Sequence, residues 1–498
     1  MAEAAAAAQA VDIQPPDEFT CLADTSSDDI TSWEQLGLDA VGRGEVAACV
    51  LAGGQGTRLG FDGPKGCYDI CLPSGKPLFQ IFVERLRRLV MLAEQAGGRN
   101  PRMTFLVMTS PINHNETVDF FEKHSFFGMS RNDVWFFEQG TLPCMTTEGK
   151  IILESAGVVA TAPDGNGGLY PALKKSGCLD RLQSLGVKSL HVFSVDNPLC
   201  RPADPRFVGY CLSKKADCGN KCVWKVSPDE KVGVVAKRGG RAGVVEYSEL
   251  DDARKQLRDA NGRLVFGAGN ICNHFFDVDF LANVVVPSMA TMFHLAHKKI
   301  PFAGDDGRTV KPDSNNGIKL EAFVFDVFGM SNRMAILETR REEEFAPVKN
   351  APGTANDSPD SARAMVNALC RSWVEQAGGR VEGNADAVLE VSPLISYAGE
   401  GLQELVNCQI ITAPTNLEVQ AAEPAFQFYI QNPDGSLSLH YGLPPAGYVD
   451  VTRPAQPVVS SIANGYTYAS PQVMTTQARG RSPERKKKAS KKKKSGCC

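Results

Sequence analysis

Short apolar runs alternate with helical patterns along the first 200 residues of the chain. Four runs, each bounded by glycine or polar residues, have the length and composition of buried strands: 46–51, 103–109, 134–139 and 190–195. A helix is predicted between the first two, because Pro77 suits a first turn, apolar residues recur at helical spacing and Gly97 ends the pattern. This alternation predicts an α/β fold with a doubly wound sheet of the nucleotide-binding type.

The pattern changes further along the chain. Residues 232–276 form shorter, alternating segments, which predict a mixed, partly antiparallel lobe on the sheet. Residues 380–470 are rich in β-formers, proline and glycine, which is typical of a small β-rich domain. We therefore divide the chain into a helical N-terminal lead-in, a catalytic domain, a C-terminal domain and a disordered polybasic tail: 1–45, 46–320, 321–480 and 481–498.

A glycine-rich loop directly follows the first strand. Gly53 and Gly54 let backbone N–H groups approach an oxyanion closely, and Arg58 and Lys65 add two cations to the same loop. No Gly-Lys-Ser/Thr follows at P-loop distance, and Leu59 stands where the dinucleotide fingerprint needs its third glycine. An ordinary turn would explain the glycines alone. The added cations favour a site for nucleotide phosphates.

Two further polar groups follow predicted strands. The segment 164–168 reads Asp-Gly-Asn-Gly-Gly, and Asp196 comes directly after the run 190–195. A long turn and a strand-end cap would explain these features individually. In an open parallel sheet, however, ligands bind at the carboxyl ends of the strands, so we expect both groups near the glycine loop.

The composition is normal for a soluble globular protein, with 43% hydrophobic and 22% charged residues. No apolar run is long enough to span a membrane, and the alanine-rich N-terminus lacks the features of a secretory signal. The fifteen cysteines are scattered through apolar stretches without zinc-type spacing. This usage is typical of reduced thiols in a cytoplasmic protein.

The net charge of −4 conceals an acidic body and a basic tail. From Arg479 onward there are ten Lys and Arg residues and one Glu, which leaves 43 basic and 56 acidic residues, or −13, in the rest. Nucleic-acid binding needs basic residues on the folded domain, so no nucleic-acid partner is expected. A solvated tail is the ordinary interpretation. Alternatively, Cys497 and Cys498 resemble the doubly prenylated ends of vesicle-trafficking small GTPases, and one lipid beside a basic patch suffices for membrane contact.

Taken together, the motifs resemble those of the eukaryotic UDP-N-acetylhexosamine pyrophosphorylases, a uridylyltransferase family. The matching stretches are 51–60 with 64–66, 162–170, 195–197, 245–249, 268–270, 316–319, 345–350 and 392–400. The resemblance implies a sheet of the nucleotide-diphospho-sugar transferase type. It also implies a reaction that joins UTP to N-acetylglucosamine 1-phosphate, or to the galactosamine epimer, and releases pyrophosphate with Mg²⁺ as cofactor.

The resemblance assigns the uridine to Gly53, Gly54, Gly165 and Gln139, with the Gln139 amide at the uracil edge. It places Asn166 near the sugar and its phosphate. These are polar or glycine positions at predicted strand ends, which is the chemistry that fixes the orientation of a ligand.

The hexosamine is assigned in the same way to Gly168, Glu246 and Asn270. Phe323 and Phe325 are implied as the walls of the N-acetyl pocket, since an apolar surface accepts a methyl group.

The implied chemistry is an in-line attack by the sugar phosphate on the α-phosphorus of UTP, which needs alignment and charge neutralisation but no protein nucleophile. Arg58 and Lys65 would contact the pyrophosphate, and Asp196 would ligate Mg²⁺. Lys319 and Lys349 would approach the sugar phosphate and the α-phosphate, respectively. Without the resemblance, a strand-end cap and solvated surface charges would explain these residues.

Two alternatives stay open. One is a UDP-glucose or broad UDP-sugar pyrophosphorylase, against which the Phe323 and Phe325 pocket favours an N-acetylated sugar. The other is a non-catalytic UDP-sugar sensor or a membrane-tethered scaffold, against which the retained charged residues argue. The sequence is compatible with a monomer or a homodimer.

Overall fold

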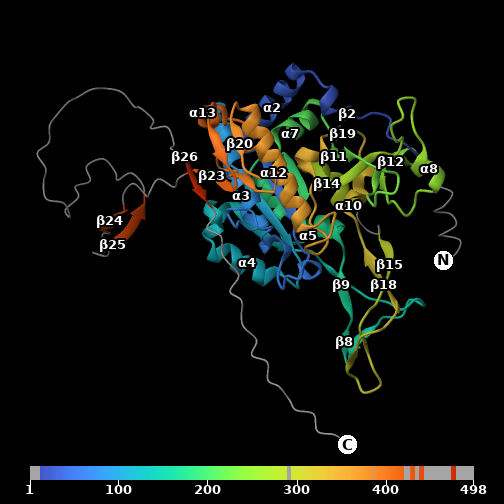
Figure 1. The fold of residues 1–498 in the computed structure, drawn as a ribbon. Helices are drawn as coiled ribbons and strands as arrows, with labels where there is room; N and C mark the ends of the chain where they lie inside the picture. The colour runs from blue at the N-terminus through green and yellow to red at the C-terminus, as the bar shows by residue number, and fades with distance from the viewer. Residues whose placement is uncertain are drawn as a thin grey trace, which may run out of the picture.

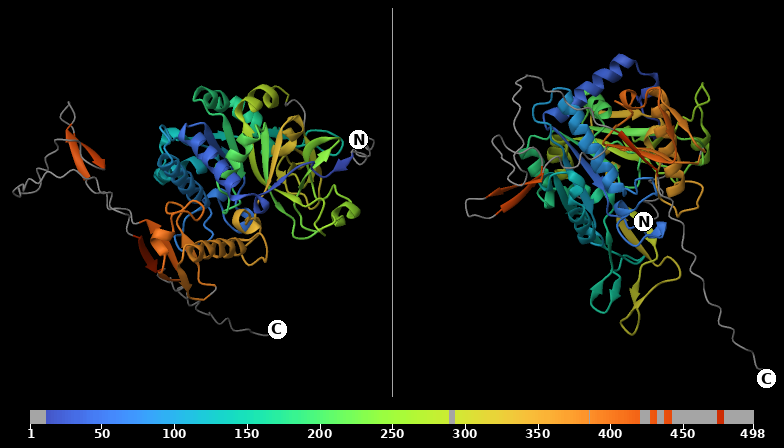
Figure 2. Two further views of the ribbon diagram at one scale, coloured as in Figure 1. Left: turned by 90° about the horizontal axis from the view of Figure 1, so that it is seen from above. Right: turned by 60° about the vertical axis from the view of Figure 1, so that its left-hand side comes forward.

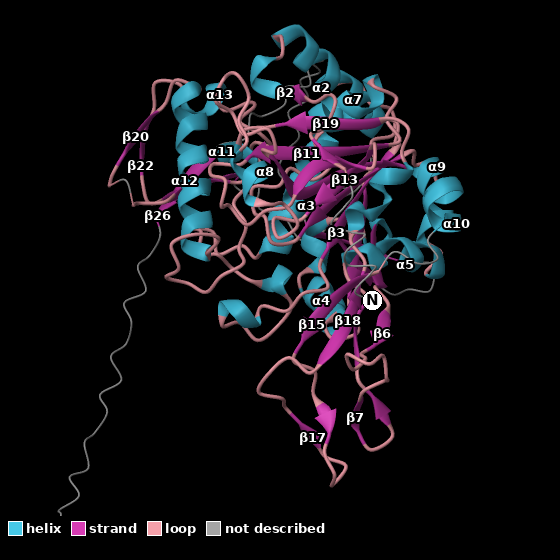
Figure 3. Ribbon diagram, turned by 90° about the vertical axis from the view of Figure 1, so that its right-hand side faces the viewer, coloured by secondary structure: helices cyan, strands magenta, loops and turns pink. Residues whose placement is uncertain are grey.

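The computed structural model describes residues 12–288, 293–384, 386–419, 427–431, 437–441 and 473–477 (Figure 1). The predicted tail at 481–498, with its two terminal cysteines, lies outside the described residues. The described chain forms a large mixed sheet covered by helices, with a two-hairpin arm that projects from one side (Figure 3). No helix in this part of the chain has the length and apolar character needed to cross a membrane.

Four parallel strands form the centre of the large sheet. Their order is β10 (Ser189–Ser194), β3 (Val46–Leu51), β4 (Thr104–Thr109) and β5 (Val134–Glu138). Each corresponds to one of the four predicted apolar runs, and β3 is buried along its entire length. Because the strands are parallel, the loops that follow them emerge at one edge of the sheet.

The sheet continues beyond β10 with strands of both directions. β14 (Ala268–Asp277) is antiparallel to β10 and to β11 (Cys218–Trp224), which confirms the predicted mixed sheet. β19 (Met334–Glu338) is parallel to β11 and extends the sheet past the predicted domain boundary at residue 320. β2 (Thr20–Cys21) of the lead-in pairs with β19. The remaining strands of the sheet are β12 (Val234–Arg238), β13 (Arg241–Val245) and β1 (Ile13–Gln14).

Successive residues of β3 face two separate hydrophobic cores. Val46, Ala48 and Val50 face one core, and the residues between them face the other. The first core includes α2 (Ser27–Gly42), α3 (Leu78–Gln95), α4 (His114–Lys123), α7 (Pro205–Ser213) and α12 (Pro359–Gln376). The second includes α5 (Leu169–Lys175), α6 (Cys178–Ser184), α9 (Val278–Phe280) and the 3₁₀-helix η8 (Val324–Met330). The predicted doubly wound arrangement is thus confirmed, and Figure 2 shows the sheet between its helices.

Two hairpins form the arm, which comprises residues 141–163 and 294–321 (Figure 3). Met145 and Ile318 exchange backbone hydrogen bonds between the two segments, and a small apolar cluster fills the space between them. The strands are β6 (Thr141–Pro143), β7 (Leu153–Ser155), β8 (Val158–Val159), β9 (Thr161–Pro163), β15 (His294–Lys298), β16 (Phe302–Ala303), β17 (Thr309–Val310) and β18 (Gly317–Glu321).

The C-terminal part packs against the first core through α12 and against α3 through charged groups. The Lys76 ammonium lies 2.9 Å from Glu84 Oε2 of α3 and 2.5 Å from Glu418 Oε1 of the C-terminal part. Its strands are β20 (Arg380–Glu382), β21 (Leu389–Val391), β22 (Ile410–Thr412), β23 (Thr415–Val419), β24 (Gln427–Gln431), β25 (Leu437–Tyr441) and β26 (Val473–Gln477). The other short helices are α8 (Asp252–Gln256), α10 (Val286–Ser288), α11 (Arg341–Glu344) and α13 (Gln403–Val406).

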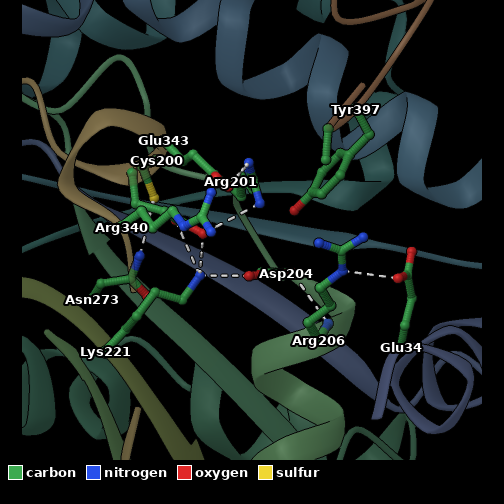
Figure 4. Close-up of polar contacts among 12 residues, drawn as sticks. Glu34, Cys200, Arg201, Asp204, Arg206, Lys221, Asn273, Arg340, Glu343 and Tyr397 are labelled. Carbon is green, nitrogen blue, oxygen red and sulfur yellow. Dashed lines mark hydrogen bonds and ion pairs between the residues drawn. The ribbon is translucent and has the colours of Figure 1, made fainter. Parts of the chain in front are cut away.

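A buried ionic network joins β11, α7 and α11. The Lys221 ammonium lies 2.5 Å from Asp204 Oδ2 and 3.0 Å from Glu344 Oε1, and Arg201 Nη1 lies 3.5 Å from the same Glu344 oxygen (Figure 4). All four side chains are almost completely buried. Burial disfavours the charged ammonium, but Asp204 and Glu344 outweigh it and raise the pKa of Lys221. The network therefore consists of two cations and two carboxylates that neutralise each other inside the protein.

We expect Lys221→Met to lower the free energy of unfolding by about 3–5 kcal/mol, because it leaves two carboxylates buried without their shared cation. Urea unfolding of the full chain, followed by circular dichroism, measures this change. Lys174→Met is the matched control, since Lys174 pairs with Asp180 at the exposed surface and should cost no more than about 1 kcal/mol. Equal effects of the two substitutions would contradict the predicted role of the network.

Candidate functional site

The glycine loop after β3 is held from the neighbouring strand. Asn113, at the start of α4, donates its side-chain amide to the carbonyl oxygens of Ala52 and Gly54, at 2.9 and 3.3 Å. Ser110, directly after β4, donates its hydroxyl to the carbonyl oxygen of Gly53 at 2.8 Å. Both side chains are buried. They orient the carbonyl groups of the loop toward the protein and so fix the course of its backbone.

Gln139 lies against this loop, as the resemblance implies. A Cβ on Gly53 would be 3.0 Å from Gln139 Oε1, so glycine allows the buried amide to lie close to the backbone. A Cβ on Gly54, in contrast, would meet no atom within 4 Å. The Gln139 amide thus lies against a glycine loop that is open for contact at Gly54.

The second glycine loop, residues 164–168, also comes to this edge. Gly165 has a positive φ of 89°, and a Cβ on Gly168 would lie 2.0 Å from Asp164 Oδ1, so both positions require glycine. Burial raises the pKa of the Asp164 carboxyl. Its Oδ1 is buried and has no hydrogen-bond partner within the described part of the chain.

Backbone contacts connect the second loop to the segment that carries the two predicted phenylalanines. Gly167 donates its N–H to Ala322 O at 2.8 Å, and Ala322 donates its own N–H to Asp164 O at 2.7 Å. Asn166 Oδ1 accepts the N–H of Val324 at 2.9 Å. The side-chain oxygen of Asn166 therefore has a structural role, in addition to any contact that its amide makes with a ligand.

Phe323 and Phe325 form a stacked apolar surface beside this loop. Their ring centroids are 5.0 Å apart with an interplanar angle of 19°, and the His294 ring lies 4.7 Å from that of Phe323. His294 Nε2 is 2.8 Å from Asp326 Oδ1, and this hydrogen bond raises the pKa of the imidazole. The two rings predicted to line the N-acetyl pocket therefore form one aromatic wall, with a titratable ring at its edge.

Lys65, Arg58, Asp196 and Lys349 come together from distant parts of the sequence. Burial lowers the pKa of the Lys65 ammonium; Asp196 acts in the opposite direction, and Arg58 and Lys349 lower it further. The Lys65 ammonium donates to Val348 O at 3.4 Å, and Val348 donates its N–H to Asp196 O at 2.7 Å. Three cations and one carboxylate thus lie within electrostatic range of each other, which suits a ligand with several phosphates.

Glu246 and Asn270 belong to the same region as Lys349. Burial and the nearby Glu249 raise the pKa of Glu246, whereas His294 and Lys349 act to lower it. Asn270 lies in β14, and its Oδ1 accepts the N–H of Cys272 at 3.1 Å. Glu246 therefore lies within electrostatic range of His294, at the aromatic wall, and of Lys349, and Cys272, two residues after Asn270, lies within electrostatic range of Asp196 and Lys349.

Lys319 differs from the other predicted residues in its position. It lies in β18 of the arm, where its charge acts to lower the pKa of the Cys144 thiol, although burial raises that pKa overall. Of the fifteen predicted residues, the glycines, Gln139, Asn166 and the two phenylalanines surround the two loops. Arg58, Lys65, Asp196, Lys349, Glu246 and Asn270 surround the charged end, and Lys319 alone depends on the arm for its placement.

Several residues that shape the site have no role in the sequence analysis. Ser110 and Asn113 follow β4 and obey the same strand-end rule that singled out Asp196, so this signal was available. Asp357 has a positive φ of 53°, and its carbonyl oxygen accepts the N–H groups of Lys349 and Asn350 at 2.7 and 2.8 Å. His294 carries no local signal, because the arm brings it to the site from outside the sheet.

Asp196 is the predicted ligand of a divalent cation, and it lies within electrostatic range of Lys65. Among the described residues, no group of three His, Cys, Asp or Glu side chains could hold a metal by itself. A single carboxylate beside a phosphate-binding loop nonetheless fits Mg²⁺, which usually keeps several waters and shares one or two carboxylates with substrate phosphates. The donor set is therefore compatible with Mg²⁺ bound together with a nucleotide.

Known proteins are similar to most of this chain. "UDP-N-acetylhexosamine pyrophosphorylase-like protein 1" of Xenopus tropicalis is 42% identical over 428 residues, which is 82% of this chain and 84% of that protein. "UDP-N-acetylglucosamine diphosphorylase 2" of Arabidopsis thaliana is 42% identical over 423 residues, 82% of each chain. A crystal structure of the uridine diphosphate N-acetylglucosamine pyrophosphorylase from Trypanosoma brucei in complex with an inhibitor is 35% identical, with a TM-score of 0.72, and the match covers 80% of this chain and 86% of that one.

The family model described as UTP--glucose-1-phosphate uridylyltransferase matches residues 12–402. This range contains both glycine loops, the central sheet, the arm and α12. With relatives at 42% identity over four fifths of its length, the chain belongs to the UTP--glucose-1-phosphate uridylyltransferase family.

Proposed function

We propose that this chain transfers a uridylyl group from UTP to N-acetylglucosamine 1-phosphate and releases pyrophosphate. One observation carries the proposal: a nucleotide-type glycine loop, a buried amide, a stacked aromatic wall and a cluster of three cations meet at one sheet edge. The names of the similar proteins refer to the same chemistry. N-acetylgalactosamine 1-phosphate is a second acceptor, because the two sugars differ at one hydroxyl.

The geometry suits an in-line displacement at the α-phosphorus of UTP. An ionised oxygen of the sugar phosphate attacks, a new P–O bond forms, and the bond to pyrophosphate breaks. We assign the crowded negative charge to Arg58 and Lys65 at the pyrophosphate and to Lys349 at the α-phosphate. Burial and the nearby Arg58 and Lys349 lower the pKa of the Lys65 ammonium, and a phosphate bound beside it would oppose that shift and favour the charged form. Asp196 would hold Mg²⁺, which supplies a Lewis acid for the phosphate oxygens when bound.

The remaining assignments follow from the position of each residue. Gln139 reads the uracil edge beside Gly53 and Gly54, and Gly165 approaches the uridine from the second loop. Gly168, Glu246 and Asn270 hold the hexosamine, and Lys319 reaches its phosphate from the arm. Outside the site, we propose a cytoplasmic enzyme, monomeric or homodimeric, whose basic Cys-Cys tail allows a weak or lipid-assisted membrane contact.

A panel of sugar 1-phosphates tests the reaction. Purified full-length protein with UTP and Mg²⁺ should form UDP-sugar from N-acetylglucosamine 1-phosphate. The value of kcat/KM for this substrate should exceed that for glucose 1-phosphate, because only the N-acetylated sugar has a methyl group to pack against the aromatic wall. Release of pyrophosphate measures the rate. A preference for glucose 1-phosphate would favour the UDP-glucose alternative, and binding of UDP-sugar without turnover would favour a sensor.

Phe323→Ala should lower kcat/KM for N-acetylglucosamine 1-phosphate by about tenfold or more, since an apolar contact of this size contributes about 1–3 kcal/mol to discrimination. The rate with glucose 1-phosphate should change little. Phe293→Ala is the matched control, because this nearby ring is exposed. An equal loss with both sugars would show that Phe323 supports the fold of the site and does not select the sugar.

Asp196→Asn should lower kcat by about 100-fold or more and raise the Mg²⁺ concentration needed for half-maximal rate, because the hard anionic ligand is lost. A titration of Mg²⁺ at saturating UTP and sugar phosphate measures both quantities. Asp180→Asn, at an exposed position on α6, should behave like the unaltered protein. Unchanged turnover and Mg²⁺ dependence in Asp196→Asn would contradict the assigned role.

A further inference from the structure

A second cavity, of about 710 Å³, lies between the catalytic sheet and the C-terminal part, and none of its lining residues belongs to the candidate active site. Its walls come from the turn after β10, the start of α7, residues 340–343, α12 and residues 398–403. The volume lies within the range of small-molecule sites. The proposed reaction does not use this cavity.

One wall of the cavity carries three guanidinium groups. Arg201 is buried, and its Nη2 lies 3.2 Å from Glu343 Oε2. Arg206 uses only Nε, which donates to Glu34 Oε2 at 2.8 Å, and Figure 4 shows its two Nη groups turned away from that contact. Arg340 lies 3.7 Å from Glu343, beyond hydrogen-bond distance, and is largely exposed. Within the described part of the chain, Arg206 Nη and the Arg340 guanidinium therefore have donors without a hydrogen-bond partner.

The carboxylates of the cavity form no hydrogen bond with these donors, although Glu343 lies within ion-pair distance of Arg340. Glu343 already pairs with Arg201, and Glu342 makes no ion pair among the described residues. Three arginines and two glutamates line the cavity, and Arg201 and Arg206 also pair with Glu344 and Glu34 behind the lining, so the site offers unused N–H donors and no large excess of positive charge. An arginine with free donors favours a planar or tetrahedral oxyanion, because two N–H groups can bind two oxygens at once.

A second part of the lining is apolar. Met365, Leu369 and Trp373 line it from one face of α12, and Leu402 lines it from the loop before α13. Trp373 is only partly buried, so part of its indole faces the cavity. A ligand that fits both walls has an anionic end and a flat, apolar body.

We propose that this cavity binds an organic phosphate, with the phosphate on Arg206 and Arg340 and the apolar body on the Trp373 wall, and that its occupancy regulates the active site. The two walls lead to the active site along the chain. Residues 340–344 precede Lys349 by a few residues in the same segment. The helix α12 begins two residues after Asp357, whose carbonyl oxygen accepts the backbone N–H of Lys349.

A third connection runs through the turn after β10. Asn197, next to Asp196, donates its amide to Glu344 O at 2.6 Å and accepts the N–H of Ala346 at 3.0 Å. Four residues further on, Arg201 lines the cavity and contacts Glu343. A phosphate that bridges Arg206 and Arg340 would therefore join α7 to the segment that carries Lys349, and the coupling must act in both directions between the two sites.

Adenosine 5′-monophosphate is a suitable probe, because it combines a phosphate with a flat base. Isothermal titration of the full-length protein should give saturable binding, which the double variant Arg206→Gln, Arg340→Gln weakens by about tenfold or more. Arg58→Gln, in the active site, and Arg380→Gln, on the exposed surface, should leave the Kd within about twofold. The thermal midpoint of each variant without ligand verifies that it is folded.

One variant and one smaller ligand test the two parts of the lining separately. Ala368→Trp fills the cavity from an exposed position of α12 and should abolish nucleotide binding while both arginines remain. Inorganic phosphate should bind weakly to the unaltered protein and to Ala368→Trp, and it should not bind to the double arginine variant. The proposed site would be wrong if the nucleotide showed no saturable binding. It would also be wrong if Arg58→Gln lost nucleotide binding and the double arginine variant kept it.

The coupling between the cavity and the active site is measured through the rate of uridylyl transfer, so this test rests on the proposed function. Adenosine 5′-monophosphate should change kcat/KM for sugar phosphate by about fivefold or more in the unaltered protein and not in the double arginine variant. The basal rate of that variant without the nucleotide should equal that of the unaltered protein. Binding without any change in rate would overturn the regulatory role, and a missing basal rate in the unaltered protein would instead contradict the proposed function.

Discussion

The parallel register of β10, β3, β4 and β5 is the constraint on which the site depends. Because these four strands run in the same direction with aligned ends, the segments that follow them must converge at one edge. Asp196, the glycine loop, Asn113 and Gln139 come from four different strand ends and meet there. The glycine loop cannot be displaced alone, since its carbonyl oxygens are bound from the end of β4.

The parts of this arrangement that have local signals could be predicted from the sequence. The four central strands are continuous apolar runs, and α3 shows helical spacing between a proline and a glycine. The glycine loops have a local signal because some of their positions accept only glycine. Gly165 has a positive φ, and Gly168 lies too close to Asp164 for a Cβ atom. For the individual roles of the charged residues, the resemblance to a known family was needed, because an isolated lysine or aspartate is equally compatible with the solvated surface.

Pairing over long sequence distances could not be predicted in this way. Ala322 binds the loop at Gly167 although more than 150 residues separate them, and the short alternating runs give no indication of that partner. β19 joins the main sheet from beyond the predicted boundary for the same reason. Asn113 follows a strand that the sequence predicts. Its side-chain amide, however, binds carbonyl oxygens of the glycine loop, and only the folded structure brings these groups together.

Buried charges hold one end of the segment that carries Lys349, the residue that we propose acts at the α-phosphate. Glu344 precedes the Lys349 loop by a few residues and is fixed by Lys221 and Arg201, two cations that cannot leave it without exposing buried charge. The Lys349 loop is thus held by ionic contacts at one end and by Asp357, before α12, at the other. Arg201, which lines the second cavity, contacts Glu344 at the first support, and α12, whose later turns line the same cavity, begins two residues after Asp357 at the second. A ligand there would act on the two ends of the catalytic loop without entering the active site, and this physical connection distinguishes the cavity from an ordinary surface depression.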